Sequence, residues 1–151
     1  MLPFFKQSAI PQLPDGYRIE TSPPPTAQQL NALLTSCGES AHDAERWTLA
    51  LERSLWHISI IKVECDELAG FVRATSDLAL NANLWNLAAK PGADQAILFT
   101  VLVHRALHIL RRDLPGCSLS VSAPADALDA LKSQGFVIDP NGIRAMGLSL
   151  S

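Results

Sequence analysis

The chain has 151 residues and a formal net charge of −3, a length that suits one domain with one core. Charged residues make up 18% of the sequence, below the usual ~25%, which excludes a highly charged disordered chain. The weakly acidic total also argues against nucleic-acid binding, because lysine and arginine supply most of that affinity.

The cysteines and the hydropathy of the chain indicate its cellular compartment. Cys37, Cys65 and Cys117 are too far apart to suggest a disulfide framework or a metal site, so a reduced, cytoplasmic protein is expected. The first residues lack the pattern of a signal peptide. The most apolar run, residues 96–103, is shorter than the ~20 residues that span a bilayer, so no membrane partner is expected.

The N-terminal part predicts an arm, a strand and a helix. Residues 1–16 contain scattered prolines and are expected to form an irregular arm, followed by one domain over residues 17–151. Residues 17–21 alternate as a strand does and stop at three consecutive prolines. Thr26 can then cap a helix over residues 27–36, which carries three leucines on one face.

The middle of the chain predicts a second helix and three strands. Asp43 can cap the helix, in which Trp47, Leu51 and Leu55 follow one another at intervals of four. The strands are expected to form a meander and cover residues 57–64, 68–75 and 81–89.

A change of pattern then marks a central helix. Asp94 can cap a helix over residues 95–112, whose first half is apolar on nearly all sides. Such a pattern is typical of a buried helix. Arg111 and Arg112 stand at its C-terminal end, where the helix dipole favours cations.

The last third predicts further strands and one more helix. A strand over residues 117–123 precedes a helix over residues 125–133, and two closing strands are expected over residues 136–138 and 143–150, around an Asp-Pro-Asn-Gly turn. The whole order indicates an α+β fold in which helices cover a single sheet. A ligand crevice is expected where this sheet splits or changes order.

Four segments of the chain resemble one family. They cover residues 68–77 (LAGFVRATSD), 81–87 (NANLWNL), 126–136 and 139–146 (DPNGIRAM). They are similar to the GNAT superfamily of acetyl-CoA-dependent N-acetyltransferases, above all to its cyanobacterial and plastid branch, which includes the plant chloroplast serotonin and protein-lysine acetyltransferases. The resemblance implies an acyl-CoA N-acyltransferase fold, with a mixed, mostly antiparallel central sheet flanked by about four helices. It implies acetyl-CoA as the cofactor, an amine on a small molecule or protein as the substrate, and no metal.

The same resemblance implies where acetyl-CoA would bind. In the family, the pantetheine arm pairs with the fourth strand, and the pyrophosphate rests on N–H groups at the start of the next helix. The aligned positions are Asn86, Leu87, Ala88, Ala89, Asp94, Gln95, Ala96, Ile97, Leu98 and Phe99.

This helix start departs from the family pattern Pro-x-x-Gln/Arg-x-x-Gly-x-Gly/Ala. Asp94 stands at the Gln/Arg position, and Gln95, Ile97 and Phe99 stand where this branch has glycine. Their side chains are expected to take space that the phosphates need. The Asp94 carboxylate is expected to repel the pyrophosphate and to compete for the same N–H groups.

The acid–base residues of the family are also changed. Leu131 stands where the family has a tyrosine that protonates the leaving thiolate, and leucine cannot donate a proton. Pro124 stands at a position that is often acidic in this branch. Asp77 matches another acidic position, where it could orient an amine or hold the next loop by hydrogen bonds, and the second role is favoured.

Three histidines are weaker candidates. His104 and His108 lie four residues apart on the central helix, but no third ligand is evident, so a packed or surface pair is favoured over a metal site. His57 could act as a general base, although an ordinary histidine at a strand end is favoured.

Three hypotheses about function remain open. The slightly favoured one is a diverged family member with lost or weakened acetyl-CoA binding and a non-catalytic binding or regulatory role. The second is an active N-acetyltransferase in which the amine attacks directly, since positioning can replace a general acid. The third, compatible with either, is a subunit that pairs with itself or with an active paralogue, suggested by the low charge.

Overall fold

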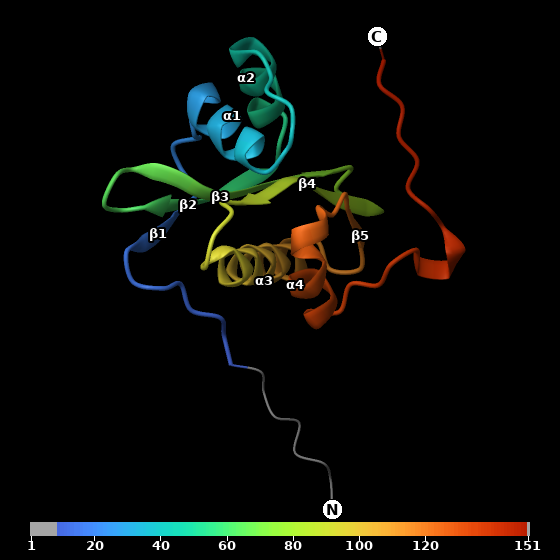
Figure 1. Ribbon diagram of the computed structural model, residues 1–151. Helices are drawn as coiled ribbons and strands as arrows, with labels where there is room; N and C mark the ends of the chain where they lie inside the picture. The colour runs from blue at the N-terminus through green and yellow to red at the C-terminus, as the bar shows by residue number, and fades with distance from the viewer. Residues whose placement is uncertain (1–8, 151) are drawn as a thin grey trace, which may run out of the picture.

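The computed structural model describes residues 9–150 and shows one sheet between two layers of helices (Figure 1). The part of the expected arm over residues 1–8 lies outside the described residues. The described residues form five strands that lie side by side in chain order: β1 (Tyr17–Glu20), β2 (Trp56–Lys62), β3 (Glu67–Ser76), β4 (Asn81–Ala89) and β5 (Ser118–Val121). Strands β1 to β4 are antiparallel, and β5 is parallel to β4. The mixed, mostly antiparallel sheet is therefore confirmed.

One face of the sheet carries α1 (Ala27–Ser36) and α2 (Ala44–Glu52). Helix α1 begins at a capping box, in which Thr26 Oγ1 accepts from the Gln29 N–H at 3.1 Å and Gln29 Oε1 accepts from the Thr26 N–H at 2.9 Å. This layer packs on the sheet through a small apolar cluster: Leu30, Leu33, Leu34, Trp47, Ile61, Leu68, Phe71 and Ala88. The apolar face of α2 is shorter than predicted. The helix ends before Leu55, which is 40% exposed.

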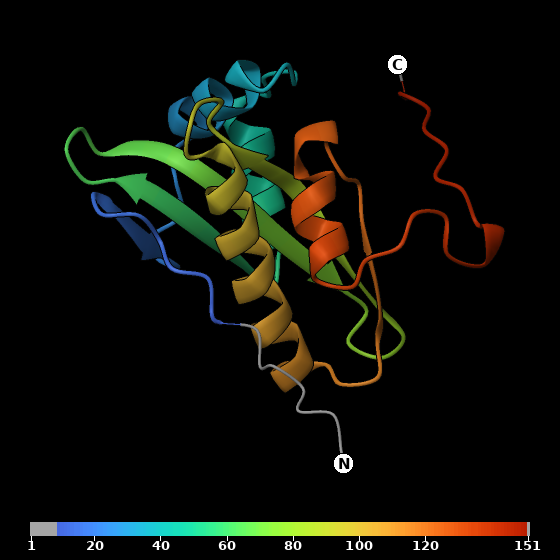
Figure 2. The same ribbon diagram turned by 60° about the horizontal axis from the view of Figure 1, so that its bottom comes forward.

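The other face carries α3 (Gln95–Asp113), the short helix η1 (Ala125–Ala127) and α4 (Leu128–Ser133). Helix α3 lies across this face (Figure 2), and its buried residues belong to the larger of the two core clusters. The apolar first half predicted a buried helix, and this is confirmed. Gln134 Nε2 donates to the Thr100 carbonyl at 3.0 Å and joins the end of α4 to α3.

The two closing strands predicted over residues 136–138 and 143–150 are wrong. The described part of this segment contains only η2 (Pro140–Gly142), and the rest runs outward from the body in both views (Figures 1 and 2). Alternation in sequence favours a strand only where a neighbouring strand pairs with its N–H and C=O groups. Here the chain turns away from β5 after α4, with positive φ values at Asp139 (47°) and Asn141 (55°).

Candidate functional site

Strand β4 carries a bulge at Asn86. The pairing register with β3 shifts there, and Asn86 has a φ of 55°, a conformation that asparagine tolerates better than most residues. Arg73 Nε donates to Asn86 Oδ1 at 2.7 Å, and Arg73 Nη1 donates to Ser54 Oγ at 3.3 Å. A half-buried cation therefore holds the bulge, and its burial lowers the pKa of the Arg73 guanidinium.

Beyond the bulge, β4 loses its parallel neighbour. Strand β5 pairs with β4 only over residues 81–84, and the side chains of residues 87–89 are at most 5% exposed. The Ala89 carbonyl accepts from Cys37 Sγ at 3.3 Å and from Gln95 Nε2 at 3.1 Å. Side chains from α1 and α3 therefore cover the end of β4.

Asp94 precedes α3, but its side chain makes no cap hydrogen bond to the helix. Its Oδ2 accepts instead from the Tyr17 hydroxyl at 2.8 Å, which raises the pKa of the Tyr17 phenol, with burial as the second cause. Within residues 9–150, no acceptor contacts the N–H groups of Ala96 and Ile97. The expectation that Asp94 occupies these N–H groups is therefore wrong, because β1 offers its carboxylate a hydroxyl donor.

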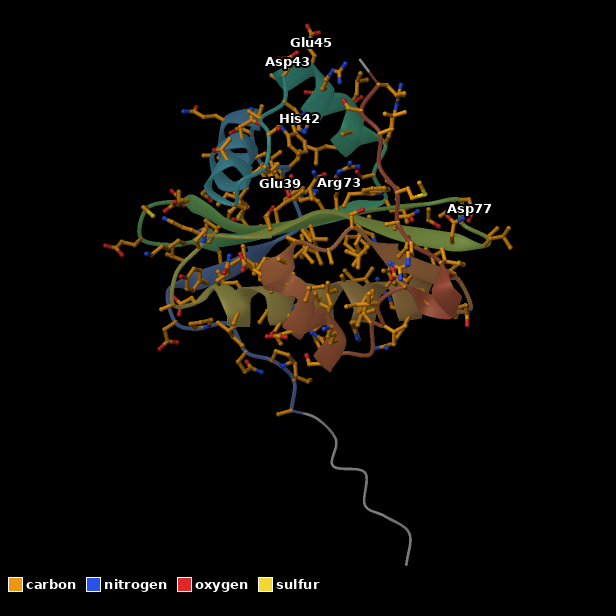
Figure 3. The ribbon with its side chains drawn as sticks, turned by 45° about the vertical axis from the view of Figure 1, so that its right-hand side comes forward. Glu39, His42, Asp43, Glu45, Arg73 and Asp77 are labelled. Carbon is orange, nitrogen blue, oxygen red and sulfur yellow. The ribbon has the colours of Figure 1, made fainter. Side chains whose placement is uncertain are left out.

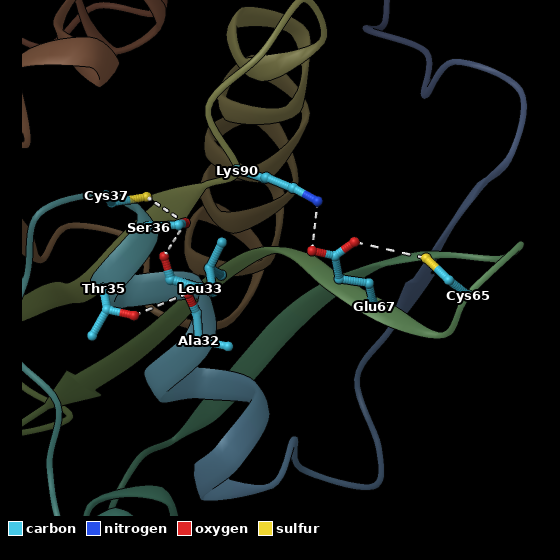
Figure 4. Close-up of polar contacts among 8 residues, drawn as sticks. All are labelled: Ala32, Leu33, Thr35, Ser36, Cys37, Cys65, Glu67 and Lys90. Atoms are coloured by element: carbon cyan, nitrogen blue, oxygen red, sulfur yellow. Dashed lines mark hydrogen bonds and ion pairs between the residues drawn. The ribbon is translucent and has the colours of Figure 1, made fainter.

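Two lysines lie beside the same helix start. Lys90 Nζ pairs with Glu67 Oε1 at 2.6 Å (Figure 4) and lowers the pKa of the Glu67 carboxyl. Lys62 and Lys90 line a hollow of about 170 Å³ together with residues 91–94. Two lysines therefore lie beside the positive end of the α3 dipole, together with the carboxylates of Glu67 and Asp94.

The residues of the first turns of α3, which include Ile97 and Phe99 at two of the family glycine positions, differ in their placement. Leu98 and Phe99 are each 1% exposed and belong to the core below the sheet. Ile97 packs against the same core while partly exposed, and Ala96 lies at the surface. The core therefore begins within the first two turns of α3.

Leu131, at the position of the family tyrosine, and Asp77 lie in different surroundings. Leu131 is 2% exposed in the core. Asp77 follows β3 at the outer end of the sheet, apart from Arg73 in Figure 3. Its Oδ1 accepts from the N–H groups of residues 79–81 at 2.8 to 3.1 Å, and these bonds lower the pKa of the carboxyl. This is the loop-holding arrangement that the sequence analysis favoured for Asp77.

The histidines lie away from the helix start. His57 is on β2, stacked on Phe71 with ring centroids 6.1 Å apart. His104 and His108 line a hollow on α3 with two arginines. Within residues 9–150, no three His, Cys, Asp or Glu side chains gather as metal ligands. None of the described helices combines the length and the apolar character needed to pass through a bilayer.

Sequence reasoning missed several residues of this site. The Tyr17–Asp94 bond joins residues 77 positions apart, and no local pattern marks such a contact. Lys62 and Lys90 likewise come close together only because β2, β3 and β4 fold into a meander, and no local pattern marks this either. Arg73 did leave a signal, because it is a charged residue in the middle of an apolar strand segment, and such a residue needs polar partners.

The chain is similar to known proteins in sequence and in structure. No family model matches the chain. The chain is 31% identical over 120 residues to the uncharacterised N-acetyltransferase ycf52 of Pyropia yezoensis, an alignment that covers 78% of this chain and 68% of the relative. It is 35% identical over 81 residues to the chloroplastic GCN5-related N-acetyltransferase 2 of Arabidopsis thaliana, covering 53% of this chain and 31% of that protein.

Two solved structures are similar in fold. A Staphylococcus aureus protein of unknown function superposes with a TM-score of 0.78 at 16% identity, over 89% of this chain and 99% of that one. The ribosomal-protein-S18-alanine N-acetyltransferase of Escherichia coli superposes with a TM-score of 0.60 at 16% identity, over 79% and 76% of the two chains. At these identities the likeness concerns the fold alone.

Proposed function

Because the chain belongs to the GNAT family of N-acetyltransferases, we propose that it binds acetyl-CoA at the start of α3 and acetylates an amine. The observation that carries this proposal is the pair of N–H groups at Ala96 and Ile97, for which the described residues 9–150 provide no acceptor. An anion at a helix N-terminus gains from such donors and from the helix dipole. Lys62 adds positive charge beside them, which suits a ligand with phosphates, whereas Lys90 is already paired with Glu67.

The residues present fit this cofactor through backbone groups. The N–H groups of α3 would hold the pyrophosphate, and the main chain of β4 beyond the bulge would pair with the pantetheine arm. The Gln95 amide now lies on the Ala89 carbonyl and has to leave it when that pairing forms. When bound, acetyl-CoA supplies an activated acetyl group.

The chain's own contribution to the reaction is positioning. Leu131 cannot protonate a leaving thiolate, so we expect that proton to come from water. Arg73 fixes the bulge of β4 and thereby the edge against which the amine and the acetyl group are held. Correct placement of two reactants by itself removes a large part of the activation barrier. Acetyl transfer without a dedicated acid is therefore expected to be slow but measurable.

Thermal unfolding with two ligands tests this function. Acetyl-CoA at one hundred times its Kd is expected to add about 2.7 kcal/mol of stability, whereas acetyl-pantetheine, which lacks the phosphates, is expected to add much less. Release of thiol in the presence of amines then measures transfer. No shift in the unfolding midpoint with millimolar acetyl-CoA would contradict the proposal.

A second candidate is a non-catalytic module that has lost or weakened acetyl-CoA binding. The observations that favour it are the buried Leu131 and the two donors on the Ala89 carbonyl, which cover the end of β4. It predicts no stabilisation by acetyl-CoA and no thiol release. Stabilisation without thiol release would leave binding as the function and exclude only the transfer step.

The cytoplasmic location expected from the cysteines stays a prediction. Cys37, Cys65 and Cys117 form no disulfide among the described residues, which suits any reducing compartment. The name of the Arabidopsis relative places that protein in the chloroplast, so we propose either the cytoplasm or a plastid for this chain. The amine substrate, on a small molecule or a protein, is also a proposal.

A further inference from the structure

Strand β5 leaves one edge of the sheet without a neighbour. Its sole partner in the described chain is β4. Its sequence, Ser-Leu-Ser-Val, contains none of the charges or prolines that usually protect an exposed edge. Beside it lies a hollow of about 360 Å³, lined largely by apolar residues of α3, of the connection that follows it and of β5, among them Leu110, Leu114 and Leu119. This edge can therefore accept a further strand.

The C-terminal segment has the pattern of the missing strand. Met146, Leu148 and Leu150 alternate with small residues and are 97%, 87% and 94% exposed. Residues 145–150 carry no charge. In an extended chain the three large side chains would share one face, which is the pattern of a strand with one buried side. A row of apolar side chains so exposed is rare unless a partner covers it.

The course of the chain separates this segment from the edge of its own β5. After α4 the backbone turns at Asp139 and Asn141, both with positive φ, and residues 143–150 extend away from the sheet in both views (Figures 1 and 2). Each molecule therefore presents a strand donor and a strand acceptor that do not meet each other. A second copy offers the matching pair.

We propose that two copies of this chain exchange their C-terminal segments, each adding residues 145–150 as a strand to the exposed β5 edge of the other. Main-chain hydrogen bonds along β5 would provide the pairing, and the hollow beside Leu119 would receive the large side chains of the segment. A twofold axis makes the two exchanges identical, so the assembly closes at two copies. The exchange does not depend on acetyl-CoA.

Sedimentation velocity of the full chain tests this exchange. The unmodified protein is expected to have twice the mass of one chain. The double variant Met146→Asp/Leu148→Asp is expected to have the mass of a single chain, with an unchanged circular dichroism spectrum. The matched control Leu49→Asp/Val63→Asp places the same charges at exposed apolar positions on α2 and after β2, and it is expected to stay dimeric.

Each other outcome overturns the proposal. A dimer that survives the tail substitutions is held together elsewhere. An unmodified chain that stays monomeric at high concentration has no exchange, and if its unfolding midpoint also falls with the tail substitutions, the segment pairs with its own β5. Loss of the dimer in the control as well as in the tail variant would show a non-specific apolar contact. All these readouts are independent of acetyl-CoA, so they leave the proposed function untouched.

Discussion

A contact with a residue distant in sequence changes the role of Asp94 at the start of α3. A carboxylate just before a helix normally satisfies the first N–H groups and blocks an anion site. Here the Tyr17 hydroxyl donates to Asp94 Oδ2 at 2.8 Å, and Asp94 does not accept from the N–H groups of Ala96 and Ile97. The negative charge nevertheless stays beside the place proposed for the pyrophosphate, so Asp94 is expected to weaken acetyl-CoA binding without abolishing it.

The substitution Asp94→Asn tests this effect. Removing one negative charge at a helix N-terminus is expected to improve the binding of an anion by about 1 kcal/mol, or roughly fivefold in Kd. Titration calorimetry with acetyl-CoA measures the change. The control Tyr17→Phe keeps the charge but releases the carboxylate toward the helix, so it is expected to weaken binding. Equal affinity of Asp94→Asn and the unmodified chain would show that the phosphates do not bind beside Asp94.

At the scale of elements, the bulge of β4 depends on two side chains. Asn86 takes a positive φ of 55°, and its Oδ1 accepts from Arg73 Nε at 2.7 Å. Asn86→Ala combines a backbone conformation that costs about 1–2 kcal/mol with the loss of a hydrogen bond to a cation. Asn86→Gly loses the hydrogen bond but relieves the backbone. The alanine variant is therefore expected to be the less stable of the two by about 1 kcal/mol.

Urea unfolding of the two Asn86 variants measures this difference. Ser120→Ala is a control, because Ser120 Oγ on β5 donates to Asn83 Oδ1 on β4, and its loss affects β4 outside the bulge. If the glycine and alanine variants unfold at the same urea concentration, the bulge relaxes when Asn86 is replaced. In that case Arg73 does not fix the edge of β4 in the way proposed above.

Elements that depend on local patterns could be predicted, and those that depend on distant partners could not. Thr26 marks the start of α1, and the predicted boundaries of the helix match the structure. Strand β2 follows from its three isoleucines. The alternation of residues 143–150 predicts a strand, but no strand forms without a neighbour. At the site, the resemblance indicated Asp94 and Asn86, whereas their partners Tyr17 and Arg73 were fixed by the register of the folded sheet.

For the whole molecule, the two faces of the sheet differ in polarity. The face toward α3 is packed with apolar residues. The face toward α1 and α2 holds polar side chains among its apolar cluster: Ser59 is 1% exposed, and its Oγ has no partner among the described residues. His57 Nε2 is likewise buried without a partner, and Arg73 lies directly across from His57 on β3. This layer is therefore where the fold is most sensitive to charge.

Stability is expected to fall as pH is lowered, through His57. Burial lowers the pKa of His57 below its ordinary value, although a hydrogen bond involving the Pro23 backbone opposes this in part. Between the unfolded pKa of about 6.5 and the lower folded pKa, the unfolded chain binds more protons, so acid favours unfolding. Protonation would also place a second cation opposite Arg73. The stabilising effect of neutral His57 is complete above about pH 7 and is lost as pH falls through the folded pKa.

Thermal unfolding from about pH 7 to about pH 5 measures this dependence. The unfolding midpoint of the unmodified chain is expected to fall across this range, and the fall is expected to be smaller in His57→Gln, which has no proton to gain. His108→Gln removes an exposed histidine on α3 and is expected to reproduce the behaviour of the unmodified chain. If His57→Gln loses as much stability on acidification as the unmodified chain, the acid sensitivity lies in the carboxylates instead, and the layer between the sheet and α1 tolerates a second charge.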